Sequence, residues 1–169
     1  LALQGRGREG DAIAHYRRAL ELQPGFADAQ CNLGNALKET GHLMDAVAAY
    51  RRALVLRPDF AGAFYNLGNA LKELGQLDGA IAAFEAAIAL QPDYAKAHSN
   101  LGNALKETGR MKDALAAFER ARHLEPQKES FQTNIIFMQD FCADIGLADQ
   151  QAERRRWNET FILPLARHI

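Results

Sequence analysis

Net charge, cysteine and long apolar runs are all scarce in this 169-residue sequence, and each shortage excludes a class of function. The 20 Lys and Arg residues nearly balance the 21 Asp and Glu residues, so a formal charge of −1 gives no reason to expect nucleic acid or an anionic membrane as partner. No apolar run approaches the roughly 18 residues of a membrane-spanning helix, and no signal peptide is visible. The two cysteines, Cys31 and Cys142, lie too far apart in the sequence to suggest a disulfide. We therefore predict a reducing, cytoplasmic compartment.

Residue sets for catalysis or metal binding are also missing. The five histidines show no metal-ligand spacing, and with two isolated cysteines no zinc site is expected. No nucleophile, base and acid can be assembled from spacing. Residues 5–10 match a G-x-G-x-x-G nucleotide motif, but no strand pattern precedes them. We expect no enzyme, no metal and no cofactor within these residues.

What the sequence does contain is a period of 34 residues. Three groups recur at this spacing: Pro24, Pro58, Pro92 and Pro126; Gly7, Gly41, Gly75 and Gly109; and Gly34, Gly68 and Gly102. The sequence Asn-Leu-Gly-Asn-Ala-Leu-Lys-Glu occurs at 32–39, 66–73 and 100–107. A fixed period of this length predicts a stacked repeat array rather than a closed globular enzyme.

Each period carries two helical patterns. In the first, which starts at Ala27, small or apolar residues follow the spacing of one helix face. The second runs from Leu43 to Leu56, and Pro58 ends it. Gly41 permits a reversal between them, so we predict two antiparallel helices of about 14 residues each, or roughly 21 Å.

Glycine inside the first helix needs an explanation, because it costs on the order of 1 kcal/mol relative to alanine. We expect an aromatic ring of the second helix to fill the space beside each of these glycines. The candidate rings also recur every 34 residues: Tyr16, Tyr50, Phe84 and Phe118.

The pattern resembles the tetratricopeptide repeat (TPR), whose signature pairs Leu-Gly in the first helix with Ala-x3-aromatic in the second, followed by Pro. The repeat at 27–60 matches through Leu33-Gly34, Ala46, Tyr50 and Pro58, and the next two repeats match at the equivalent positions. The main departures are Gln30, Phe64 and His98 where the family often has Trp, and Leu37, Leu71 and Leu105 where it often has Tyr. The resemblance implies an all-α, right-handed superhelix of antiparallel helix pairs that binds proteins or peptides.

The repeat boundaries follow from the period. We predict a partial repeat at 1–26, full repeats at 27–60, 61–94 and 95–128, and a degenerate repeat with capping and connector helices at 129–169. The last region should hold helices over about Glu129–Phe141 and Leu147–Ile162, the second ended by Pro164.

The N-terminal part should present an open edge. Leu1 aligns with Asn35, so we expect the chain to open inside a helix, as a fragment of a longer protein. Gly7 is in register with the glycines between helices. The apolar edge around Leu3, Ile13 and Leu20 would favour head-to-tail self-association.

The repeated Asn-Leu-Gly-Asn-Ala-Leu-Lys-Glu sequence resembles, more narrowly, the repeats that precede the catalytic domain of O-linked N-acetylglucosamine transferases and the related SPINDLY proteins. Residues 140–141, 149–157 and 164–165 resemble the connector of bacterial members. The resemblance implies the polypeptide-recognition part of a larger glycosyltransferase whose catalytic domain follows Ile169. The alternative is a stand-alone adaptor that scaffolds protein complexes.

The candidate binding residues are asparagines. In the TPR family the position of Asn32, Asn66, Asn100 and Asn134 lines the concave face, and in the transferases such a row is the implied peptide-binding ladder. An amide offers an acceptor and two donors, which suit the N–H and C=O of an extended peptide. A second row lies beside the first: Asn35, Asn69 and Asn103. The alternatives are local bonds between adjacent repeats for the first row and a solvated helix face for the second.

Two further readings are less favoured. TPR proteins that hold carboxylates use a Lys/Asn clamp, but Cys31 and Asn100 stand where two of its basic residues would be. The Arg154–Trp157 run could be a nucleic-acid patch. We interpret it as the charged outer face of a capping helix with a docked Trp.

Overall fold

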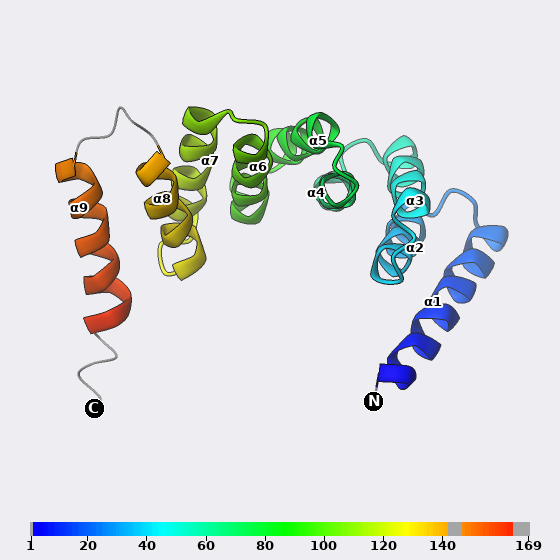
Figure 1. Ribbon diagram of the computed structural model, residues 1–169. Coiled ribbons are helices and arrows are strands. Elements are labelled where there is room, and N and C mark those ends of the chain that lie inside the picture. Colours follow the sequence, from blue (N-terminus) through cyan, green and yellow to red (C-terminus); the bar gives the residue numbers. More distant parts are fainter. Residues whose placement is uncertain (1, 142–146, 164–169) are drawn as a thin grey trace. The chain divides into compact units, whose positions relative to one another are not determined.

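The computed structural model describes residues 2–141 and 147–163 and divides the chain into two compact units, Leu1–Pro92 and Asp93–Ile169. Within the described residues all regular secondary structure is helical (Figure 1). The first unit holds α1 (Ala2–Leu22), α2 (Ala27–Glu39), α3 (Leu43–Leu56), α4 (Ala61–Glu73) and α5 (Leu77–Leu90). The second holds α6 (Ala95–Glu107), α7 (Met111–Leu124), α8 (Glu129–Phe141), α9 (Leu147–Trp157) and the π-helix η1 (Asn158–Ile162). Cys142, Pro164 and Leu165 lie outside the described residues.

Helices pack in consecutive pairs, as the period predicts. The pairs α2–α3, α4–α5 and α6–α7 each form one antiparallel hairpin. The helices that open a hairpin have 13 residues and those that close it have 14, in agreement with the predicted length. The all-α fold of antiparallel helix pairs is confirmed.

A left-handed glycine closes the first helix of each hairpin. Gly41 has a φ of 81°. Its N–H donates to the carbonyl of Lys38 at 3.0 Å, and the N–H of His42 donates to the carbonyl of Leu37 at 2.8 Å. These two bonds define a Schellman motif, which satisfies the last carbonyls of α2 and reverses the chain. Gly75 and Gly109 repeat the conformation with φ of 73° and 78°.

An aromatic ring packs on each helical glycine, as predicted. A Cβ atom added to Gly68 would lie 2.6 Å from Cε1 of Phe84, and the Gly34–Tyr50 and Gly102–Phe118 contacts are equally close. All three rings are fully buried. The glycine therefore sets how closely the two helices of a hairpin approach.

One expectation about the N-terminus is wrong. The register predicted an inter-helix turn at Gly7, but α1 continues through Gly7 from Ala2 to Leu22. Glycine inside a helix costs only on the order of 1 kcal/mol relative to alanine, so a glycine in register does not by itself require a turn. The G-x-G-x-x-G motif thus lies within a helix.

The last two expected helices are present, and the second has a change of pitch. α9 passes at Trp157 into the π-helix η1. The rings of Trp157 and Phe161 lie 6.4 Å apart across this junction, and the Trp157 side chain is half-buried. No helix within the described residues is long and apolar enough to cross a membrane.

Candidate functional site

The asparagines of both predicted rows lie on the first helix of each hairpin and on α8. In the first unit α2 carries Asn32 and Asn35, and α4 carries Asn66 and Asn69. In the second unit the members are Asn100 and Asn103 on α6 and Asn134 on α8. Asn32 is exposed, and the other six are half-buried. Each row therefore sits at the border between the packed core and solvent.

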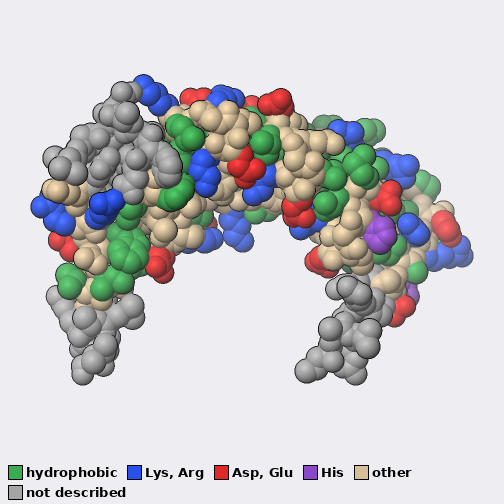
Figure 2. Space-filling model, in the orientation of Figure 1, with side chains coloured by type: hydrophobic (Ala, Val, Ile, Leu, Met, Phe, Trp, Pro, Cys, Tyr) green, Lys and Arg blue, Asp and Glu red, His purple; other side chains and the backbone are tan. Residues whose placement is uncertain are grey.

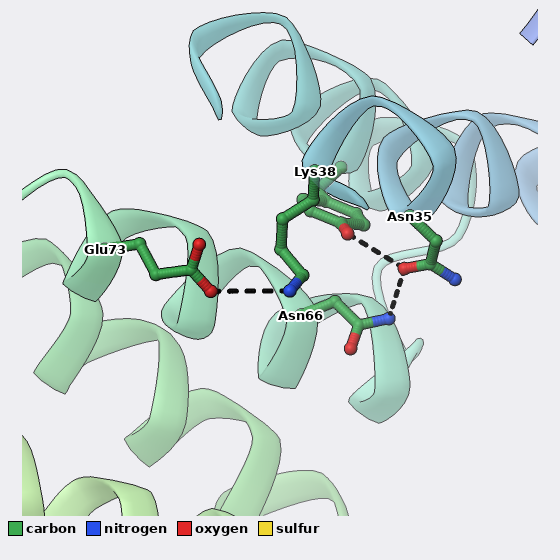
Figure 3. Close-up of polar contacts among 5 residues, drawn as sticks. Asn35, Lys38, Asn66 and Glu73 are labelled. Atoms are coloured by element: carbon green, nitrogen blue, oxygen red, sulfur yellow. Dashed lines mark hydrogen bonds and ion pairs between the residues drawn. The ribbon is translucent and has the colours of Figure 1, made fainter. Parts of the chain in front are cut away.

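The structure brings the two rows together across adjacent repeats. Nδ2 of Asn66, from the first row, donates to Oδ1 of Asn35, from the second row, at 2.9 Å (Figure 3). The two residues come from α4 and α2, so the bond joins one repeat to the next. Local bonding between repeats, one of the two interpretations of the asparagine row, is thus present at Asn66.

A tyrosine completes this contact. The hydroxyl of Tyr50 donates to the same Oδ1 of Asn35 at 2.8 Å, from the fully buried ring on α3. Burial, with smaller contributions from Cys31, Glu39 and Glu73, raises the pKa of Tyr50, so the hydroxyl keeps its proton. Two donors therefore converge on one amide oxygen and fix which way the Asn35 amide faces.

An ion pair lies beside the amide contact. Nζ of Lys38 is 3.3 Å from Oε1 of Glu73, again linking α2 to α4 (Figure 3). The side chains are 29% and 47% exposed, so the pair contributes no more than about 1 kcal/mol. Although both side chains are partly exposed to solvent, they too connect adjacent repeats.

Cys31 lies under the amide contact. Nδ2 of Asn66 is 3.9 Å from its sulfur, and the side chain is only 4% exposed. Burial raises the pKa of the Cys31 thiol, while the contact with Asn66 acts in the opposite direction. Because a reactive cysteine is an accessible thiolate, this one is a packing residue.

The second unit carries its own version of this face. Nζ of Lys106, on α6, lies 5.2 Å from the ring centroid of Phe137 on α8. The ring of Phe137 is 50% exposed, so this cation–π contact is accessible to a ligand. In the first unit the equivalent lysine, Lys38, forms an ion pair with the Glu73 carboxylate instead.

Three of these residues were not predicted as part of the site. Tyr50 was expected only as a ring beside a helical glycine, and no role was predicted for Lys38 or Glu73. A signal exists for each. Tyr50 carries a hydroxyl where Phe84 and Phe118 have none, and Lys38 and Glu73 are one period plus one residue apart.

On the face drawn in Figure 2, Lys and Arg side chains are interspersed with Asp and Glu side chains and form no basic patch among the residues described there. Across the described residues no group of three or more His, Cys, Asp or Glu side chains is placed to hold a metal ion. The site offers amide hydrogen-bond donors and acceptors, with charged side chains beside them.

Solved structures with a similar fold are numerous. A crystal structure of MamA superposes with a TM-score of 0.80 at 24% identity, covering 93% of this chain and 88% of that one. YrrB, described as a TPR protein with an unusual peptide-binding site, gives 0.77 at 22%, covering 99% and 86%. A Thermobaculum terrenum O-GlcNAc transferase mutant gives 0.70 at 23%, covering 82% of this chain but 27% of that one. At these identities the likeness shows the fold.

Comparison with models of sequence families identifies the same fold over most of the chain. No curated protein matches it. A family model for the TPR repeat matches residues 6–41, 34–75 and 68–109, and a second, for the tetratricopeptide repeat, matches 95–128. Together these cover every hairpin described above, and the chain belongs to the tetratricopeptide repeat family.

Proposed function

We propose that the asparagine face of each unit binds extended polypeptide. This face is defined as Asn32, Asn35, Asn66 and Asn69 in the first unit and Asn100, Asn103 and Asn134 in the second. One observation carries the proposal. Within the described residues, the Asn35–Asn66 bond uses the oxygen of one amide and the nitrogen of the other. Nδ2 of Asn35 and Oδ1 of Asn66 have no hydrogen-bond partner there.

These two remaining groups suit a peptide backbone. An extended chain presents C=O and N–H groups, which can accept from Nδ2 of Asn35 and donate to Oδ1 of Asn66. Because the bonds from Tyr50 and Asn66 already orient the Asn35 amide, little side-chain freedom is lost on binding. Local bonding and peptide binding are therefore compatible. YrrB, with a described peptide-binding site on the same fold, supports this class of partner.

The test is to remove the amides. Asn66→Ala should weaken binding of acceptor-like peptides a few-fold, since one net hydrogen bond contributes about 0.5–1.5 kcal/mol. The Asn66→Ala, Asn100→Ala double variant should lower affinity by roughly tenfold or more. The loss should be similar for peptides of different sequence, because the amides bind backbone. Binding is measured by calorimetry on a peptide panel.

Thermal melts separate binding from folding in this test. Asn158→Ala, which removes an exposed amide from η1, is the control and should leave affinity unchanged. If the double variant kept full affinity while its melting temperature fell, the asparagine face would be structural and the proposal would fail.

The finer proposal concerns the whole protein. We propose that the chain is the polypeptide-recognition part of a larger O-GlcNAc transferase or SPINDLY-like protein. The repeated Asn-Leu-Gly-Asn-Ala-Leu-Lys-Glu sequence supports this. The alternative is a stand-alone adaptor, and the coding sequence after Ile169 distinguishes the two. Head-to-tail self-association also stays a proposal, supported by Ile13 and Leu20 on α1, which are only half-buried.

A further inference from the structure

A pocket of about 520 Å³ opens in the first unit on the other side of α2 from the asparagine face. Leu20 of α1 and Leu33 and Leu37 of α2 form its apolar walls, and α3 contributes Ala48 and Ala49. The pocket has the volume of small-ligand sites, and charged side chains lie beside its apolar walls: Arg17, Glu21, Asp45 and Arg52. Gln30 also lines it, and it lies about 160° around α2 from Asn32 at roughly 100° per residue. The pocket and the asparagine face are thus separate surfaces.

Gln30 supplies a polar group with no partner. The side chain is only 8% exposed, and among the described residues its Oε1 accepts no hydrogen bond. A buried acceptor left unsatisfied is costly, so it is a natural point of attachment for a donor. The pocket therefore combines apolar walls with one unmet acceptor.

The repeat register shows what fits there. One period after Gln30, the corresponding position on α4 holds Phe64. The next repeat thus carries a half-buried phenyl ring at this position, and the repeat after it carries His98. Three periods after Gln30, glutamine returns as Gln132, and a pocket of about 360 Å³ returns with it, lined by Pro126 and Gln132. An open pocket accompanies glutamine at this position in both units.

We propose that this pocket, the Gln30 pocket, binds the ring of a Tyr or Trp side chain of a partner polypeptide. The ring takes the position that corresponds by register to the Phe64 side chain of the next repeat, and its O–H or N–H donates to Oε1 of Gln30. The rim carries charges of both signs, with Arg17, Arg52 and Asp45 all exposed. Recognition is therefore by the ring and its donor rather than by charge.

The test compares blocked amino acids that differ by one hydroxyl. N-acetyl-tyrosinamide and N-acetyl-phenylalaninamide are titrated into the isotope-labelled chain, and amide shifts around the pocket are followed by NMR. The tyrosine compound should bind roughly threefold to tenfold more tightly, the effect of one net hydrogen bond. Equal affinities would overturn the role of Gln30. If free phenol bound but N-acetyl-tyrosinamide did not, the proposal that a polypeptide side chain occupies the pocket would be wrong.

Two variants locate the binding. Gln30→Phe, which copies the next repeat, should abolish the saturable shifts while the helical circular dichroism is unchanged. Gln30→Leu keeps most of the pocket but removes the acceptor, so the affinity of the tyrosine compound should fall to that of the phenylalanine compound. Asn66→Ala on the asparagine face should leave binding at the Gln30 pocket intact. This result would make the pocket test independent of the peptide binding proposed for the asparagine face. Undiminished tyrosine binding by Gln30→Phe would place the ring elsewhere and end the proposal.

Discussion

Single glycines set the geometry of the hairpins. At Gly68 the helix would gain about 1 kcal/mol from alanine by propensity alone. The new Cβ would, however, lie 2.6 Å from the Phe84 ring, which is fully buried. Overpacking of this kind costs roughly 1–3 kcal/mol, so contact and propensity oppose each other.

We therefore predict that Gly68→Ala lowers the free energy of unfolding by up to about 2 kcal/mol. Gly10→Ala is the matched control. Gly10 also lies within a helix, but no described atom is within 4 Å of its added Cβ, so this change should be neutral or stabilising by up to about 1 kcal/mol. Urea unfolding followed by circular dichroism measures both. If both changes stabilised the protein, the Phe84 ring would be shown to move aside for the added Cβ.

The hydroxyl of Tyr50 links stability to pH. Because burial raises its pKa in the folded state, the unfolded chain loses this proton first as the pH rises. Its contribution is fully present below about pH 10, the ordinary tyrosine pKa, and is lost progressively above it. At neutral pH the bond to Asn35 should be worth about 0.5–1.5 kcal/mol.

Tyr50→Phe should thus be less stable than wild type at pH 7, and the difference should shrink as the pH rises past about 10. Taking the difference between the two proteins cancels the titration of all other groups. Denaturant unfolding at pH 7 and pH 10.5 gives the four values needed. A constant difference across that range would mean that the hydroxyl does not titrate with folding.

At the scale of elements, the helices are held by packing and by their C-terminal turns. None of the N-cap residues of α2 through α7 makes a side-chain capping bond; these residues are Phe26, His42, Phe60, Gln76, Tyr94 and Arg110. The first helix of each hairpin ends instead in a Schellman motif. The left-handed glycine there carries the reversal that makes a hairpin.

Gly41→Ala should destabilise the first complete hairpin by about 1 kcal/mol, because a left-handed residue with a Cβ costs roughly 1–2 kcal/mol. No described atom approaches the added Cβ within 4 Å, so the cost is one of backbone conformation alone. Gly25→Ala has the same open surroundings without a positive φ and should cost little. A calorimetric scan of the two variants compares their melting temperatures. Equal melting temperatures would show that the turn adopts another conformation.

Elements were predictable from the sequence where a local signal and the period agreed. Leu43–Leu56 and Glu129–Phe141 are helices with the expected bounds, since apolar spacing marks both, and Gly41 and Pro58 flank the first. The continuation of α1 through Gly7 was not predicted, because a glycine in register marks a possible turn without showing whether the helix continues through it.

At the scale of the whole molecule, the sequence places both asparagine rows but not their partners. Asn35 and Asn66 are 31 residues apart, and whether their amides meet depends on how α2 and α4 stack, which no local pattern specifies. The Gln30 pocket is a similar case. A departure from the family pattern was visible at this position, but the space that it opens depends on three helices together.

The close contact between glycine and ring is completed inside one repeat. Gly34 meets Tyr50, Gly68 meets Phe84 and Gly102 meets Phe118, each 16 residues apart. A 34-residue segment of the gene therefore encodes its own interlocked pair. Duplicating or deleting such a segment in register leaves every such pair intact and alters only the junctions between repeats. The length of the array, and with it the number of asparagines on its asparagine face, can thus change in evolution by unequal recombination without redesign of the core.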